Sequence, residues 1–156
     1  MPFSTTWSYI VSNRLINRVL STNAGWAPLA LRIPVGIILI AHGGQKLFGL
    51  FGGYGLAGTG QWMDSVGIHP GYLMALLAGS AEFFGGLALL FGLLVRPAAA
   101  VVAFTMLVAI FSVHISKGLF MANNGYEYAL ALLAVTVALL MSGAGRLSVD
   151  EALTTR

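Results

Sequence analysis

The chain has 156 residues, of which 58% are hydrophobic and only 8% are charged. Soluble domains carry about 25% charged residues, so this composition excludes a soluble globular protein and indicates an integral membrane protein. The net charge of +3 suits loops that face anionic lipid and does not point to nucleic acid. The absence of cysteine excludes disulfides and thiolate chemistry carried by this chain, and three scattered histidines form no metal motif.

The first 25 residues are predicted to form an amphipathic helix on the membrane surface, with a disordered tail as the alternative. Apolar residues repeat at helical spacing along one side of residues 3–20, and polar residues such as Arg14 and Arg18 fill the other side. We therefore divide the chain into a surface helix over residues 1–25 and a membrane domain over residues 26–156.

Four apolar spans in the membrane domain predict an all-α fold, a four-helix transmembrane bundle. They run from about Pro28 to Phe51, from Tyr72 to Val95, from Pro97 to Ser116 and from Tyr126 to Met141. The fourth span is near the lower limit of about 17 residues for crossing a hydrocarbon core. Only Arg96 separates the second span from the third.

Two short helices are predicted outside these spans. The glycine-rich segment 52–71 joins the first two spans, and residues 59–66 within it are expected to form a helix on the membrane surface. The run from Ser148 to Glu151 matches a capping box, which predicts a short helix near the C-terminus.

The distribution of basic residues predicts the orientation. With four spans, Arg14, Arg18, Arg96, Arg146 and Arg156 fall on one side of the membrane. The lysines at positions 46 and 117 are the only basic residues that approach the other side. Basic loops stay in the cytoplasm, so we expect both termini to be cytoplasmic.

Two ionisable residues lie deep inside the spans, His42 in the first and Glu82 in the second. A charge in hydrocarbon costs about 2.5–3.5 kcal/mol on insertion scales, so such residues are usually hidden against a partner or in a watery cavity. Glu82 lies on a row of small residues and is therefore expected to face a neighbouring helix. His42 or Lys46 would hold its carboxylate ionised.

Helical rise places polar groups from all four spans in the outer half of the bundle, and these are the candidate ligand-binding residues: His42, Gln45, Lys46, Glu82, His114 and Glu127. Such a cluster favours a site that binds a polar headgroup or moves protons. The alternative is a buried ion pair that only fixes the register of the helices. Arg32 and Arg96 are interpreted as interfacial anchors that reach lipid phosphates.

Four ordered motifs resemble the DoxX family of small bacterial inner-membrane proteins. They are His42–Gly49, Ala81–Gly86, Gly92–Pro97 and Gly143–Asp150, and the resemblance spans Leu29 to about Asp150. It implies a four-helix, multi-pass protein of the bacterial inner membrane. The motif positions that it carries over are His42, Gln45, Lys46, Glu82, Arg96 and Arg146. Relatives include quinone-reducing oxidoreductase subunits, partners of oxidative-stress enzymes and quinone resistance proteins, so the resemblance also implies a redox role.

The leading hypothesis is a subunit of a membrane oxidoreductase system that binds a quinone-like or polar-headed lipid in the outer half of the bundle. His42, Lys46 and Glu82 would supply donors to the oxygen atoms of a quinone, the candidate cofactor. Electrons would come from a partner redox protein or another cofactor. The alternative is a non-enzymatic membrane anchor or scaffold for a redox or stress-response partner. The small-residue faces also allow a homo-oligomer.

Overall fold

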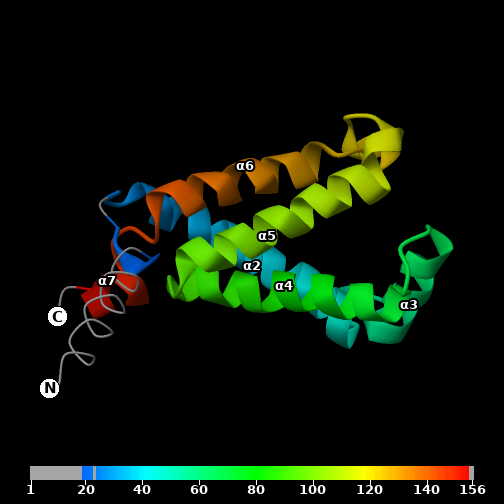
Figure 1. Cartoon of the computed structure of the whole chain (residues 1–156), viewed down its shortest axis with the longest axis horizontal. Helices are drawn as coiled ribbons and strands as arrows, with labels where there is room; N and C mark the ends of the chain where they lie inside the picture. The colour runs from blue at the N-terminus through cyan, green and yellow to red at the C-terminus, as the bar shows by residue number, and fades with distance from the viewer. Residues whose placement is uncertain (1–18, 23, 155–156) are drawn as a thin grey trace, which may run out of the picture.

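The computed structural model describes residues 19–22 and 24–154, and these ranges contain helices and turns but no strand. Figure 1 shows an elongated bundle of long helices, with the short helix α3 at one end and the short helix α7 at the other. We call these the α3 end and the α7 end. The predicted all-α bundle is confirmed.

The four bundle helices are α2 (Ala27–Phe48), α4 (Gly71–Phe91), α5 (Val95–Ala109) and α6 (Glu127–Ser142). The two short helices are α3 (Gly55–Ser65) and α7 (Val149–Thr154). Single turns complete the α3 end: a 3-10 turn at Leu50–Gly52, a π-helical turn at Ile110–His114, and 3-10 turns at Ile115–Lys117 and Met121–Asn123.

Three of the described helices are long and apolar enough to cross a membrane. They are α2, α4 and the helical stretch that continues α5 as far as Lys117. The fourth, α6, has 16 residues and so a length of about 24 Å, somewhat less than a hydrocarbon core of about 30 Å. The chain is therefore a multi-pass membrane protein whose fourth span is short, as predicted.

The prediction that Arg96 alone links the second and third spans was wrong. Gly92 ends α4 in the left-handed conformation, with φ of 68°, and Leu94 has φ of 49°. The turn therefore comprises residues 92–94, and Arg96 is the second residue of α5. Glycine enters this conformation without a steric penalty, which makes Gly92 the natural stop.

Both predicted short helices are present. α3 begins at Gly55, four residues before the predicted start, and α7 begins directly after Ser148. The Ser148 hydroxyl accepts a hydrogen bond of 3.1 Å from the Glu151 amide, as in a capping box. The predicted N-terminal helix over residues 3–20 lies outside the described residues, except for Val19 and Leu20, which are helical.

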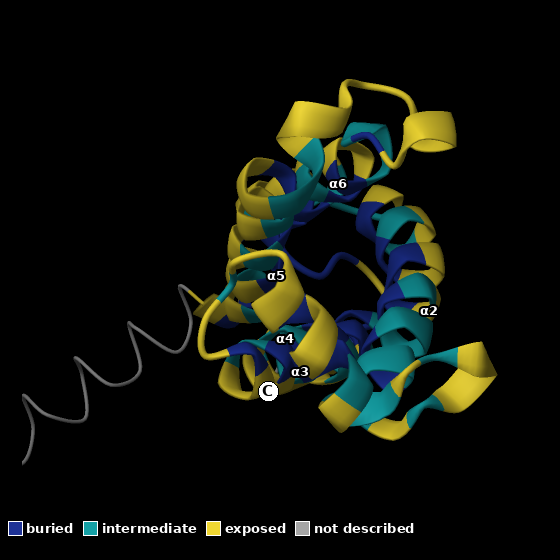
Figure 2. Ribbon diagram, turned by 90° about the vertical axis from the view of Figure 1, so that its right-hand side faces the viewer, coloured by how far each residue is buried: buried dark blue, intermediate teal, exposed yellow. Residues whose placement is uncertain are grey.

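The bundle consists of two closely packed pairs. α2 packs chiefly against α4, and α5 packs chiefly against α6. Contact between α4 and α5 joins the pairs, whereas α2 and α6 touch only sparsely. Figure 2 looks at the α3 end and shows the buried faces turned inward and the exposed faces turned outward, as expected for helices that meet lipid.

Glycines allow the close approach of α2 and α4. A Cβ atom added at Gly43 would clash with the backbone of Phe83, and one added at Gly86 would lie 2.8 Å from the Gly36 carbonyl oxygen. Small residues let membrane helices pack backbone against backbone.

The neighbouring glycines in α2 provide a matched test. Gly43→Ala is expected to destabilise the protein by about 1–3 kcal/mol, because the added methyl group overpacks the α2–α4 contact. Gly44→Ala meets only the Leu50 side chain, at 3.4 Å, and should be neutral or stabilising because alanine favours helix. Thermal unfolding in detergent measures both variants. Equal melting temperatures would show that the close approach is unimportant.

Candidate functional site

The centre of the candidate site is an ion pair between α2 and α4. Lys46 Nζ donates to Glu82 Oε2 at 2.5 Å, and the side chains are 25% and 8% exposed. Gly79, one turn before Glu82, lets α2 approach here, since a Cβ atom there would lie 2.8 Å from the Leu47 side chain and 3.3 Å from Lys46 Cβ. Glu82 thus faces a neighbouring helix, as predicted, and its direct partner is Lys46, not His42.

His42 lies one turn before Lys46 on the same face of α2 and turns toward α6. Its Nε2 atom is 3.5 Å from the Tyr128 hydroxyl, and the two ring centroids are 5.7 Å apart. This contact crosses the sparse α2–α6 boundary. The site therefore has two side-chain pairs, Lys46–Glu82 and His42–Tyr128, which together involve α2, α4 and α6.

Tyr128 was missed as a candidate site residue. It precedes Leu132, Thr136 and Leu139 by one, two and three helical turns, and those three residues are buried. Residues spaced by whole helical turns share one face of a helix, so Tyr128 lies on the same inward face of α6 as these three buried residues. α6 is so uniformly apolar that its sequence alone does not show which face is inward.

The other three predicted site residues make hydrogen bonds with the backbone at the α3 end. Gln45 Nε2 donates to the Phe51 carbonyl at 3.3 Å. His114 Nδ1 lies 2.7 Å from the Asn124 carbonyl oxygen, and Glu127 Oε1 accepts from the Met121 amide at 2.6 Å. These contacts order the turns around the site. A contact of these three residues with a ligand stays a prediction.

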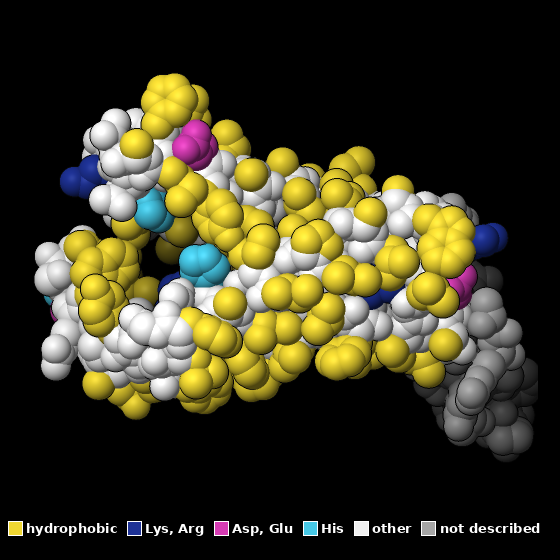
Figure 3. Space-filling view, turned by 180° about the vertical axis from the view of Figure 1, so that it is seen from behind, with side chains coloured by type: hydrophobic (Ala, Val, Ile, Leu, Met, Phe, Trp, Pro, Cys, Tyr) yellow, Lys and Arg dark blue, Asp and Glu magenta, His cyan; other side chains and the backbone are white. Residues whose placement is uncertain are grey.

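The surface is hollowed at this same end. Figure 3 shows the hollow between the two lobes of the α3 end, with histidine side chains at its margin and a basic side chain within it. Beyond the site, toward the α7 end, the interior is closed by an apolar core that includes Leu39, Leu89, Val102 and Leu139. Polar groups thus gather where the bundle is open.

Asp64 of α3 fixes the start of α4 beside this hollow. Its Oδ1 atom accepts from the Gly71 amide at 2.7 Å and lies 2.8 Å from His69 Nδ1. The Gly71 hydrogen bond, followed by the contact with His69, lowers the pKa of the Asp64 carboxyl. The carboxylate therefore stays ionised at the exposed N-terminus of α4, where negative charge is favourable.

The interpretation of Arg32 as an interfacial anchor was wrong. Its side chain is 1% exposed and donates to five backbone carbonyl groups. The acceptors are Ala144 at 3.1 Å, Leu89 at 3.2 Å, Leu90 at 2.8 Å, Arg146 at 3.3 Å and Leu147 at 2.5 Å. The last carbonyls of a helix lack intrahelical partners, so they accept from the buried guanidinium and take the place that lipid phosphate was expected to have.

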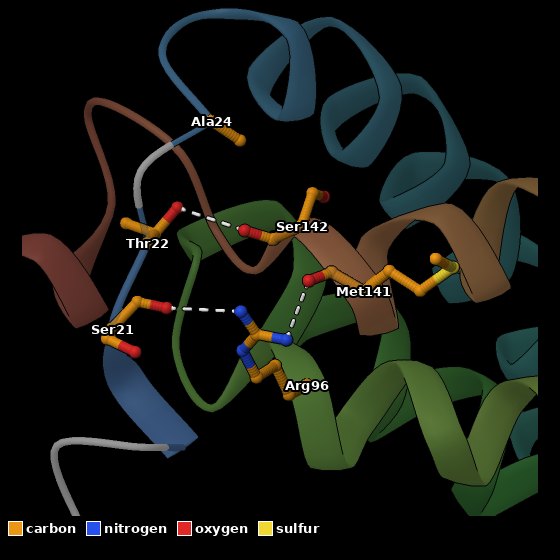
Figure 4. A pocket seen from close by; sticks show the side chains of 6 residues that line it. All are labelled: Ser21, Thr22, Ala24, Arg96, Met141 and Ser142. Atoms are coloured by element: carbon orange, nitrogen blue, oxygen red, sulfur yellow. Dashed lines mark hydrogen bonds between the residues drawn. The ribbon is translucent and has the colours of Figure 1, made fainter.

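Arg96 likewise binds backbone carbonyl groups. Figure 4 shows its guanidinium between Ser21 and Met141. Its Nη1 atom donates to Leu140 and Met141 at 2.6 and 2.8 Å, which caps the C-terminus of α6. A recess of about 340 Å³ lies here, and Arg96 is the one charged residue among the described residues that line it. It is remote from Lys46 and Glu82.

Asp150 of α7 completes the α7 end. Its carboxylate accepts from the amides of Leu94 and Val95 at 2.7 and 3.0 Å and so caps α5. Burial raises the pKa of the Asp150 carboxyl, while the two amides and the charge of Arg32 oppose that effect. At the α7 end, Arg32, Arg96 and Asp150 thus all bind backbone groups of helix ends or turns.

Comparison with known proteins places this chain in a family. The model of the family described as DoxX matches residues 27–115. The chain belongs to the DoxX family. The matched segment contains His42, Lys46 and Glu82 and ends before Tyr128, so the family model covers one complete pair of the site and half of the other.

Three relatives are similar over most of their length. "Putative oxidoreductase CatD" of Bacillus subtilis (strain 168) is 35% identical over 71% of this chain and 76% of its own. "Inner membrane protein YqjF" of Escherichia coli (strain K12) is 37% identical over 80% of this chain and 90% of its own. An "Uncharacterized protein" of Haemophilus influenzae is 33% identical over 78% and 86%. No solved structure matches the chain.

Proposed function

We propose that this DoxX protein is the membrane subunit of an oxidoreductase system and that the α3 end binds a quinone-like or polar-headed lipid. The observation that carries the proposal is the buried Lys46–Glu82 pair at the hollowed end of the bundle, with His42 one turn away. The name of the Bacillus subtilis relative supports the oxidoreductase class.

The arrangement favours a ligand-binding site over an ion pair that only fixes the register of the helices. The register of α2 against α4 already follows from the glycine contacts at Gly36, Gly43 and Gly86. An ion pair is a costly way to repeat that function, because both charges must be desolvated. The second pair, His42–Tyr128, lies across a boundary where the helices hardly touch, so it adds little to packing.

The proposed chemistry divides the work between this chain and a partner. Reduction of a quinone to a quinol adds two electrons and two protons. A partner redox protein would supply the electrons, while His42, Lys46 and Glu82 hold the oxygen atoms and exchange protons. The rings of Phe48 and Phe83 meet edge to face beside Glu82, with their centroids 5.3 Å apart, and offer an apolar wall for the quinone ring.

Binding is the direct test. In lipid nanodiscs, the wild type is expected to bind a decyl-substituted 1,4-benzoquinone saturably, and Glu82→Gln should weaken binding by about 1–3 kcal/mol through the loss of a charged partner. Arg146→Gln is the control, because Arg146 lies at the other end over the Trp26 ring, 5.6 Å from its centroid. A wild type that binds no quinone but co-purifies with a protein would favour the scaffold alternative.

The proposed location is the inner membrane, as in the name of the Escherichia coli relative, with both termini and the α7 end in the cytoplasm. The chain has no native cysteine, so single cysteines report their side without background. In intact inner membranes exposed to an impermeant thiol reagent from the periplasmic side, Ala57→Cys in α3 should be labelled and Ala152→Cys in α7 should not. The reverse pattern would invert the proposed topology.

A further inference from the structure

The two pairs of the site share one face of α2 but reach different helices. Lys46 pairs with Glu82 of α4, whereas His42, one turn away, contacts Tyr128 of α6. Residues one turn apart on a helix have Cβ atoms about 5–6 Å apart. A ligand that enters the hollow therefore meets a polar pair toward α4 and a second polar pair toward α6.

Each pair contains both a donor and an acceptor. The Lys46 ammonium has three N–H donors and uses one for Glu82, whose carboxylate is an acceptor. The imidazole of His42 and the hydroxyl of Tyr128 can each donate or accept. Either pair can thus serve a carbonyl oxygen, which only accepts, or a hydroxyl group, which also donates.

We infer that the ligand head is a six-membered ring with oxygen atoms on opposite edges, one held by Lys46–Glu82 and the other by His42–Tyr128. This inference rests on the proposed function and gives Tyr128 a role in binding the ligand. When two electrons from the partner and two protons convert both carbonyl groups to hydroxyl groups, the new hydroxyls donate to Glu82 and His42. The same pairs therefore hold the oxidised and the reduced ring.

The relative position of the two oxygen atoms on the ring determines which ligands the site should prefer. Two oxygen atoms on adjacent carbons point to the same edge, so a catechol-type ring satisfies one pair and leaves the other without a ligand partner. A ring with a single oxygen also leaves one of the two pairs without a ligand partner. Polar sites reject ligands that leave buried groups unpaired, and this rejection is the source of the expected preference.

The test compares three reduced probes with the same decyl chain: decylhydroquinone, decylcatechol and decylphenol. Dissociation constants are measured in nanodiscs under reducing conditions. Wild type should bind decylhydroquinone at least tenfold more tightly than either of the other probes. Tyr128→Phe should lower the hydroquinone-to-phenol ratio, because only His42 then remains to hold the second oxygen. Tyr126→Phe, a matched change in a tyrosine that packs on the apolar core, should leave that ratio at its wild-type value.

A second variant guards against loss of folding. Lys46→Met combined with Glu82→Met removes both polar groups of the other pair without stranding a charge, and it should reduce the ratio to about one. Equal or tighter binding of decylcatechol by wild type would overturn the inference and leave the proposed function standing. A ratio unchanged in both variants would overturn it as well. Absence of saturable binding for all three probes would refute the proposed function itself.

Discussion

Replacing Arg32 with methionine is expected to destabilise the protein by about 3–5 kcal/mol, the usual cost of removing one partner from a buried charged network. The substitution leaves five carbonyl acceptors near one buried point without their donor. It also leaves Asp150, itself 1% exposed, without the Arg32 charge that opposes the effect of its burial. The C-terminal end of α4 and the turn before α7 should separate from the rest of the bundle.

Thermal unfolding in detergent, together with the yield of monodisperse protein, measures this effect. Arg32→Lys should lie between the methionine variant and wild type, because an ammonium has three donors in place of a five-donor fork. Arg146→Gln is the matched control at the same end and should stay within about 0.5 kcal/mol of wild type. An Arg32→Met protein as stable as Arg146→Gln would show that the carbonyl cluster is not what holds this end together.

Arg32 also shows where prediction from sequence ended. Its position near the start of an apolar span is typical of a residue that reaches the headgroups. The carbonyl groups that bind it lie 57 to 115 residues away in the sequence. One of them belongs to Leu147, a turn residue with φ of 54°. Backbone acceptors carry no side-chain signature, so no pattern in the sequence announces them.

The α3 end was more predictable because side-chain chemistry marks it. The spans follow from hydropathy, and the small residues around Glu82 predict its burial against α2, which the structure confirms. Helical rise put His42, Lys46 and Glu82 at similar depth. The choice between His42 and Lys46 as partner depends on rotation about the helix axes, which the sequence does not show.

The Lys46–Glu82 pair allows stability and function to be separated. Lys46→Met alone is expected to destabilise the protein by about 3 kcal/mol, because it strands a carboxylate that is 8% exposed; the partial exposure of Lys46 keeps the effect at the low end of the range for buried pairs. The double variant Lys46→Met with Glu82→Met should recover most of that loss, since apolar replacements of a buried pair are often neutral or stabilising.

The double variant should nevertheless bind the decyl-substituted 1,4-benzoquinone more weakly than the wild type, by about 1–3 kcal/mol, because only His42–Tyr128 remains to hold the ring. Melting temperature and quinone binding, measured on the same nanodisc samples, therefore give opposite answers if the pair is kept for a ligand. If the pair only fixes the register of α2 and α4, the double variant should lose stability and the wild type should bind no quinone. A double variant that is stable and still binds quinone like wild type would remove Lys46 and Glu82 from the site and leave His42–Tyr128 as its centre.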